Sequence, residues 1–326
     1  MRNCIKTLPT LLSLTLAAIC GPSLSYGQDA GITKVSAIID TNARATVFAP
    51  GIVSTPYSEW ATSFTPDGST VYYSLGSVYW TIVSTRKTAG GWEKPKVASF
   101  SGRWRDTDPF VTPDGKRLFF ISNRPLEGKP QDKPQPNFHI WYVDRLSGDE
   151  WGAPHYLGAP VNIEGVNNYA PSVSLKGTLY FCSRDREGNA GMASYTAGKS
   201  GDQYNAPQLM ALLGKEDTQD PFIAPDEHYM VFLSGNDLYI TYAGEHGWSK
   251  AEKLPAEVNN GDSNSSPYVS PDGKMLYYSS SRIRGFYKRD PVNTALDYDG
   301  IINENHLINN GQSNILMIPV HLPKAS

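Results

Sequence analysis

Five acidic side chains in this sequence stand just before aromatic-rich segments, in positions where chemistry could take place. They are Glu59, Asp106, Asp108, Asp217 and Asp220. Two carboxyl groups that flank a substrate can act as general acid and general base in the cleavage of a glycosidic bond. Such chemistry requires a fold that brings two of these carboxylates together.

Most of these carboxylates occupy two positions of a pattern that recurs five times along the chain. The first position holds Glu59, Asp106, Asn168, Thr218 and Asn264, and the second holds Ala61, Asp108, Ala170, Asp220 and Ser266. Trp60, Trp104, Arg105 and Tyr169 lie among them and could stack on a sugar ring or a peptide side chain. Together with Asp217, these residues predict a polar, ligand-binding ring.

An architectural role for the same residues is the alternative. Asp and Asn side chains at strand entrances often bond the backbone amides of the preceding loop. Arg124, Arg184 and Arg282 could neutralise the carboxylates within the sheets. The spacing of carboxylates that belong to different repeats cannot be read from the sequence.

Residues 283–314 form a long insertion that breaks the pattern. They combine basic, aromatic and acidic side chains, among them Arg284, Tyr287, Arg289 and His306. Loops of this length in compact domains are either functional or disordered. The insertion is our candidate for a specificity loop, with disorder as the alternative.

The sequence gives no reason to expect a cofactor. Its six histidines show no spacing typical of metal ligands. The segment from Asp297 to Gly300 resembles part of a calcium loop, but the downstream acidic ligand is missing. Calcium at that segment is the alternative to a plain polar turn.

The elements that position these residues are five copies of a turn flanked by two strands. The turns are Pro66-Asp67-Gly68, Pro113-Asp114-Gly115, the degenerate Leu175-Lys176-Gly177, Pro225-Asp226-Glu227 and Pro271-Asp272-Gly273. An aromatic-rich strand follows each turn, then a third strand, and then a segment marked by an aromatic residue and a proline. Proline fixes φ, the Asp side chain can bond the turn amides, and glycine supplies a positive φ.

Copies of four short strands that recur about every 46 to 62 residues predict the blades of an all-β propeller. Five blades are favoured, with six as the alternative. The last copy lacks a fourth strand, and residues 48–52 near the N-terminus resemble it. We therefore expect the N-terminal strand to close the ring. Trp92, Trp151 and Trp248 recur at one position and predict packing between blades, and Trp80 and Trp141 are expected in the core.

The repeats resemble the WD40-like Pro-Asp repeats of TolB-like propellers over about residues 48–320. The Pro66-Asp67-Gly68, Pro113-Asp114-Gly115 and Pro271-Asp272-Gly273 turns carry the resemblance, as do the strand ends at Ser122-Asn123-Arg124, Ser183-Arg184 and Ser281-Arg282. The resemblance implies a propeller that serves mainly as a binding scaffold. Related repeats accompany serine peptidases, but no Gly-x-Ser-x-Gly motif occurs in this chain.

The N-terminus reads as an export signal. Arg2 and Lys6 precede an apolar run, and small residues follow, so cleavage is expected after Ser25 or Gly27. We take residues 1–27 as the signal peptide and 28–326 as the propeller. Cys20 lacks the flanking residues of a lipoprotein site, so a lipid anchor is not expected. No transmembrane segment is expected in the mature chain.

These features predict a periplasmic or extracellular protein. The formal net charge of −3 gives no reason to expect nucleic acid as a partner. The main expectation is a non-catalytic binding propeller that recognises an envelope protein segment or a cell-envelope glycan at the channel mouth. The alternative is a glycan-active hydrolase or lyase, which needs two carboxylates facing one pocket, one of them with a raised pKa.

Overall fold

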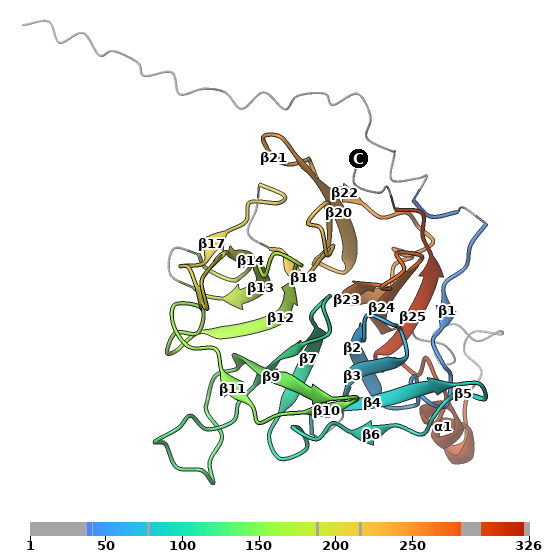
Figure 1. The fold of residues 1–326 in the computed structure, drawn as a ribbon. Coiled ribbons are helices and arrows are strands. Elements are labelled where there is room, and N and C mark those ends of the chain that lie inside the picture. Colours follow the sequence, from blue (N-terminus) through green and yellow to red (C-terminus); the bar gives the residue numbers. More distant parts are fainter. Residues whose placement is uncertain are drawn as a thin grey trace, which may run out of the picture. The chain divides into compact units, whose positions relative to one another are not determined.

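The computed structural model describes residues 38–40, 42–76, 79–186, 189–214, 217–281 and 295–322. Within this part of the chain, five blades of antiparallel strands are arranged around a central axis as a five-bladed β-propeller (Figure 1). The predicted all-β propeller is confirmed, and five blades rather than six is the correct number. No helix of the described residues is long and apolar enough to cross a membrane.

Each blade runs from an inner strand at the channel to a short outer strand. Blade 1 contains β2 (Ser58–Phe64), β3 (Thr70–Gly76), β4 (Thr81–Thr88), β5 (Gly91–Trp92) and β6 (Lys96–Val97). Blade 2 contains β7 (Asp106–Val111), β8 (Arg117–Ser122), β9 (His139–Ser147), β10 (Glu150–Trp151) and β11 (His155–Tyr156). Blade 3 contains β12 (Asn167–Val173), β13 (Leu179–Arg184), β14 (Met192–Ala197) and β17 (Gln208–Leu209), with a side hairpin of β15 (Lys199–Ser200) and β16 (Gln203–Tyr204). Blade 4 contains β18 (Gln219–Ile223), β19 (Tyr229–Ser234), β20 (Asp237–Gly244), β21 (Gly247–Trp248) and β22 (Glu252–Lys253). Blade 5 contains β23 (Ser263–Val269), β24 (Met275–Ser281), β25 (Asn314–Pro319) and β1 (Thr46–Val47).

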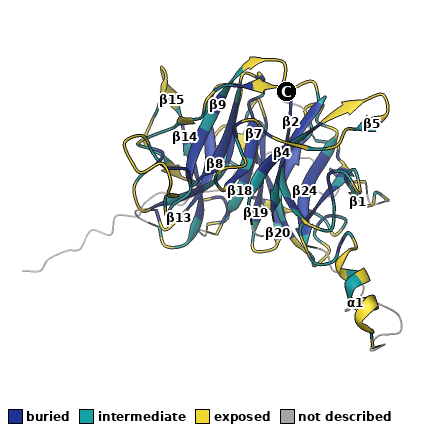
Figure 2. Cartoon of the chain, turned by 90° about the horizontal axis from the view of Figure 1, so that it is seen from below, coloured by how far each residue is buried: buried dark blue, intermediate teal, exposed yellow. Residues whose placement is uncertain are grey.

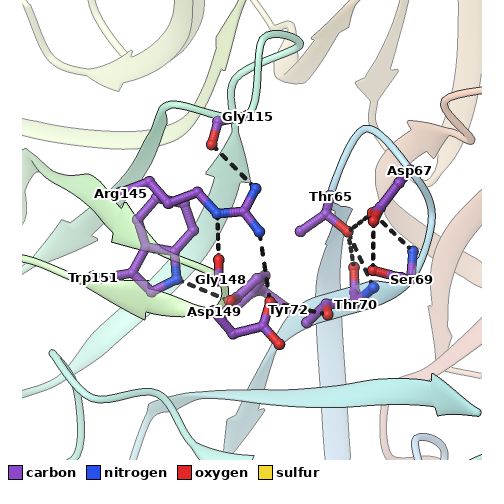
Figure 3. A network of polar contacts seen from close by, with 10 residues as sticks. All are labelled: Thr65, Asp67, Ser69, Thr70, Tyr72, Gly115, Arg145, Gly148, Asp149 and Trp151. Carbon is purple, nitrogen blue, oxygen red and sulfur yellow. Dashed lines mark hydrogen bonds and ion pairs between the residues drawn. The ribbon is translucent and has the colours of Figure 1, made fainter.

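The Pro-Asp-Gly turns are held by their own side chains. In blade 1, Asp67 accepts hydrogen bonds from the Thr65 hydroxyl at 2.6 Å and from the Ser69 amide at 3.1 Å (Figure 3). The hydrogen bond from Thr65 lowers the pKa of Asp67. Gly68 adopts a φ of +67°, which a β-carbon would strain. The aspartate of this motif is therefore explained by the turn.

The N-terminal strand closes the ring as expected, but with shifted bounds. β1 pairs with β25 through Thr46 opposite Met317 and Val47 opposite Leu316. The Phe48 amide adds a hydrogen bond to the Ile315 carbonyl at 2.9 Å. Residues 49–52 form a turn instead of continuing the strand, because the Ile52 and Val53 amides both bond the Ala49 carbonyl. The pairing ties the N-terminal segment to the last blade and covers part of the β25 edge.

The strands of the blades are largely buried (Figure 2), and aromatic side chains pack between neighbouring blades. Trp151 of blade 2 donates its Nε1–H to the Tyr72 hydroxyl of blade 1 at 2.8 Å, beside the Arg145 and Asp149 contacts of Figure 3. Trp92 packs edge-on against Phe48. These contacts agree with the predicted packing of the recurring tryptophans. Trp141 is buried as expected, but Trp80 precedes β4 and is only partly buried.

One face of the propeller carries the start of every inner strand. Because the second strand of a blade returns antiparallel to the first, the connection to the third strand opens on this same face. The insertion of blade 5 is such a connection, and its described part contains helix α1 (Tyr298–Asn305). Figure 2 shows α1 projecting outward from the blades. The Pro-Asp-Gly turns lie on the opposite face.

Candidate functional site

The inner strands line the channel in layers, one residue per blade in each layer. We call the face where the inner strands begin the mouth. The first of three successive positions on these strands holds Trp60, Thr107, Tyr169, Gln219 and Ser265, of which Thr107 is buried against Ser74 of blade 1. The next layer holds Ala61, Asp108, Ala170, Asp220 and Ser266, and below it lie Thr62, Pro109, Pro171, Pro221 and Pro267. Phe110, Phe222 and Tyr268 form the floor beneath.

The second layer owes its orientation to a bulge repeated in every inner strand. Ala61, Asp108, Ala170, Asp220 and Ser266 all have a φ between 46° and 54°, in the left-handed region. In each blade the strand register shifts at this place, from Trp60 to Ser63 in blade 1, for example. A bulge re-aims side chains, and this one directs the layer at the channel. The positive φ at this bulge falls on Ala, Asp or Ser, so no glycine in the sequence indicates where the bulge lies.

A small cavity lies at this layer and brings Asp108 and Asp220 together. Its volume is about 40 Å³, and Thr62 and Ser266 also contribute to its wall. The residues that line it include no Arg, Lys or His. Asp108 and Asp220 are partly buried residues deep in the ring. Two acidic groups from alternate blades therefore share one site without a basic partner.

Each of the two carboxylates also joins neighbouring blades. Asp108 accepts a hydrogen bond from the Ala170 amide at 3.0 Å, and Asp220 accepts one from the Ser266 amide at 2.9 Å. In blades 1 and 5 a serine of the second strand accepts the hydrogen bond from the next blade instead. Ser74 accepts from the Asp108 amide, and Ser279 accepts from the Ala61 amide.

The second strands of blades 2 and 4 offer apolar side chains at the equivalent position, Ile121 and Leu233. The aspartate of the inner strand supplies the missing acceptor there. Each carboxylate uses one oxygen for the amide of the next blade. The bond to the neighbouring blade therefore uses only one of the two oxygens of each carboxylate.

The surroundings of the two carboxylates differ. The second oxygen of Asp108 accepts from the Thr107 hydroxyl at 3.0 Å and from Trp60 Nε1 at 3.3 Å. The second oxygen of Asp220 lies 4.0 Å from the Cys182 thiol. Burial raises the pKa of both groups, and burial together with the charge of Asp108 raises the pKa of Asp220 to about 6. Asp220 is thus the group that retains a proton more readily.

The first predicted ring, in contrast, anchors the loops that precede the inner strands. Asp106 is fully buried and pairs with Arg124 at 2.8 Å, and it also accepts from Ser101. Burial raises the pKa of Asp106 and the Arg124 charge opposes this. The Asn168 and Asn264 side-chain amides bond the carbonyls of Val161 and Val258. These residues take the architectural role, and the structure does not place them in the cavity.

Glu59 occupies the same position in blade 1 and secures the closure of the ring. Its carboxylate accepts from the Thr55 amide and hydroxyl and from Asn314 Nδ2 at 2.9 Å. Burial nevertheless raises the pKa of Glu59 to about 7. Glu59 is fully buried and lies outside the cavity lining.

The raised pKa of Glu59 predicts a pH-dependent contribution to stability. The folded state holds the proton more tightly than the unfolded chain, so this contribution is complete below about pH 4.5 and is lost as the pH rises through about 7. Glu59→Gln keeps an oxygen for Thr55 and Asn314 and removes the charge. We expect the variant to gain about 1–3 kcal/mol relative to the wild type between pH 5 and pH 8. Urea unfolding across this range measures the difference, and parallel curves would contradict the prediction.

A chain of aromatic rings surrounds Asp108 at the mouth. Trp60 meets Trp80 edge-on with a centroid distance of 5.8 Å, and Trp80 stacks on Phe138 at 5.5 Å. Phe138 lies 6.2 Å from Tyr169. The close contact of Trp60 and Trp80 requires glycine at position 76, because a β-carbon there would lie within 3 Å of both rings. Sequence reasoning missed Trp80 and Phe138, since both lie in connections just before a third strand.

Four other predicted residues lie away from the cavity. Trp104 is covered by Arg103 at 5.2 Å, Arg105 is exposed with its guanidinium 5.7 Å from the Trp80 ring, and Asp217 is exposed. His306 ends helix α1 and is exposed. Arg284, Tyr287 and Arg289 lie outside the described residues, as does Arg282.

The segment proposed for calcium is the start of helix α1. Asp297 is its N-cap and accepts from the Gly300 amide at 2.8 Å. Within the described part of the chain, no group of three or more His, Cys, Asp or Glu side chains could hold a metal ion. Asp297 is thereby explained by helix capping.

Comparisons with known proteins support the fold. No protein-family model matches the chain, and no curated protein is similar to it in sequence. Among solved structures it is similar to an α-L-arabinofuranosidase from Lactobacillus brevis, with 13% identity and a TM-score of 0.51 over 82% of this chain and 92% of that one. A thermostable family-43 glycoside hydrolase gives 15% identity, a TM-score of 0.48 and coverage of 71% and 85%. A gluconolactonase from Xanthomonas campestris gives 11% identity, a TM-score of 0.46 and coverage of 88% and 92%.

The main functional expectation needs correction in view of these neighbours. We expected a non-catalytic binding propeller, but the arabinofuranosidase that shares this fold is named as an enzyme. The alternative, a glycan-active hydrolase, is therefore taken up below. The condition set for that alternative is two carboxylates at one pocket, one of them with a raised pKa. Asp108 and Asp220 meet it, whereas Glu59 and Asp106 do not.

Proposed function

We propose that this propeller is a glycan hydrolase whose acid–base pair is Asp220 and Asp108. The observation that carries the proposal is the cavity lined by aspartates from blades 2 and 4 without a basic residue in its wall. A pair of carboxyl groups with different surroundings is the arrangement that glycoside hydrolysis uses. Propellers named as an arabinofuranosidase and as a glycoside hydrolase share the fold.

The hydrogen bonds assign the two roles. Three donors, the Ala170 amide, the Thr107 hydroxyl and the Trp60 indole, favour the charged form of Asp108. Beside the Ser266 amide, Asp220 has only the longer contacts from the Ser266 hydroxyl at 3.4 Å and the Cys182 thiol at 4.0 Å, and its pKa is raised to about 6. In the proposed reaction Asp220 gives its proton to the leaving glycosidic oxygen. Asp108 takes a proton from water, and the resulting hydroxide forms the new bond to the anomeric carbon.

Thr62 provides a further polar group at the base of the cavity. The other four blades carry proline at this position, and Thr62 alone offers a hydroxyl. This hydroxyl is buried and has no hydrogen-bond partner among the described residues. A cavity of about 40 Å³ is large enough for a water molecule, and Thr62, Ser266 and the two carboxylates provide enough partners to orient it.

Asparagine variants test the proposal because they keep the oxygen that each neighbouring amide requires. We expect Asp108→Asn and Asp220→Asn each to reduce kcat about 10²- to 10⁴-fold on a responsive substrate. Release of reducing sugar from arabinan, xylan, pectin and peptidoglycan-derived glycans provides the assay. The wild-type rate should fall as the pH rises above about 6, because Asp220 then loses its proton.

Asp217→Asn is the matched control. It removes an exposed carboxylate three residues before Asp220. Its activity should equal that of the wild type, and the melting temperatures of all variants show whether each has folded. Equal activity of wild type, Asp108→Asn and Asp220→Asn would exclude the proposed acid–base pair.

We propose further that the protein is exported and related to TolB-like propellers. The signal-like residues 1–27 lie outside the described residues, and the Pro-Asp-Gly repeats support the relationship. N-terminal sequencing of the protein from a periplasmic or culture fraction tests the export. A chain that retains residues 1–27 in the cytoplasm would contradict it. If the protein is exported, its accessible substrate is an envelope or extracellular glycan.

A further inference from the structure

The mouth above the proposed acid–base pair is asymmetric. Blades 1 and 3 contribute the rings of Trp60 and Tyr169, whereas blades 4 and 5 contribute Gln219 and Ser265. The ends of the second strands form the rim, which holds Gly76, Asn123, Arg184, Gly235 and Ser281. Arg184 is the only charged residue among these five. It is exposed, and its charge acts on the neighbouring Tyr169.

Arg184 does not neutralise a carboxylate within the sheet, as its position at the end of a second strand suggested. In blade 2 the buried Arg124 bonds the Phe100 carbonyl of the preceding loop and pairs with Asp106. In blade 3 the buried Arg186 takes this task by bonding the carbonyls of Val161 and Pro160.

The acidic residue that Arg124 neutralises in blade 2 is replaced by the neutral Asn168 in blade 3. Arg184 forms no ion pair with any described residue, although seven such pairs occur elsewhere in that part of the chain. A guanidinium group next to an aromatic side chain at a binding mouth suits a planar carboxylate, which it can bind through two hydrogen bonds.

We infer that the glycan bound at this mouth contains hexuronic acid, with Arg184 binding the uronate carboxylate beside a sugar ring that packs against Tyr169. This inference rests on the proposed function for the presence of a glycan. The inference adds that the glycan is negatively charged and that Arg184 recognises this charge. A neutral sugar would lack the charge-assisted hydrogen bonds that a carboxylate forms with Arg184.

Calorimetric binding to matched probes tests the inference separately from hydrolysis. The probes are trigalacturonate, trimannuronate and their methyl esters, which differ from the acids only in the lost charge. Asp220→Asn, with Arg184 retained, serves as the parent so that no probe is consumed. The parent should bind at least one acid about tenfold or more tightly than its ester. Adding Arg184→Gln should abolish this preference, and Arg184→Lys should restore part of it.

Arg105→Gln is the matched control, because it removes a second exposed arginine near the same aromatic rings. Its preference for the acid should equal that of the parent. Equal binding of acid and ester, no binding of any probe, or a preference that survives Arg184→Gln would overturn the inference. Arg184-dependent binding of the acid without hydrolysis by the wild type would instead overturn the proposed function alone.

Discussion

Replacing Asp106 by alanine is expected to lower the free energy of unfolding by about 3–5 kcal/mol. Asp106 is fully buried, and the side chain of its partner Arg124 is only 8% exposed. The substitution would leave the guanidinium group in the interior without its counter-ion. The Arg124 hydrogen bond to the Phe100 carbonyl cannot compensate for a buried charge.

Urea unfolding followed by tryptophan fluorescence measures this effect. Asp144→Ala is the matched control, because it breaks the pair with Arg117, which has the similar distance of 2.7 Å but lies in a partly exposed position. We expect a loss of only about 0–1 kcal/mol there. The double variant Asp106→Leu with Arg124→Met should recover much of the stability, since no charge remains buried. A loss below about 1 kcal/mol in Asp106→Ala would show that the pair does not anchor the loop.

The fold could be predicted from the sequence because each repeat contains its own local signals. Proline, aspartate and glycine specify the turn within a few residues, as the contacts of Asp67 show. The missing fourth strand of the last copy then indicated where the ring closes. The exact closing residues were misplaced, because residues 49–52 form a local turn in which the Ile52 and Val53 amides bond the Ala49 carbonyl.

The candidate site was only partly predictable, because the two polar positions look alike in the sequence. Asp106 and Asp108 are two residues apart, yet Asp106 pairs with an arginine of its own blade and Asp108 faces the channel. The bulge at Asp108 directs the two side chains to different places, and no residue type in the sequence predicts this bulge. The partnership of Asp108 and Asp220 arises from the ring itself, which brings residues 112 positions apart to one cavity.

Trp80 and Arg184 show that the role of a residue depends on its exact position in a blade. An aromatic residue near a third strand suggested a core position, but Trp80 lies in the connection before that strand and stacks at the mouth. An arginine at the end of a second strand suggested neutralisation of a carboxylate. The structure gives the anchoring role to Arg186, two residues later.

Phe48→Ala is expected to lower the free energy of unfolding by about 3–5 kcal/mol, the usual cost of removing a buried phenylalanine. Phe48 is 4% exposed and follows directly on the closing strand β1. Its ring contacts Tyr277 of blade 5 at 5.0 Å, Trp92 of blade 1 at 5.4 Å and Phe64 of blade 1 at 5.9 Å. One side chain therefore joins the two blades at which the ring closes.

The contact with Trp92 makes the loss visible by fluorescence as well as by urea unfolding. Phe48→Leu keeps most of the buried volume and should cost less than half as much. Tyr57→Ala, in the same N-terminal segment but 61% exposed, should change stability by no more than about 0.5 kcal/mol. If Phe48→Ala were no more destabilising than Tyr57→Ala, the N-terminal strand would not hold the ring closed. The hydrogen bond between Asn314 and Glu59 joins the same two blades. If the two contacts act as one closure, the loss of unfolding free energy in the double variant Phe48→Ala with Asn314→Ala should exceed the sum of the two single losses.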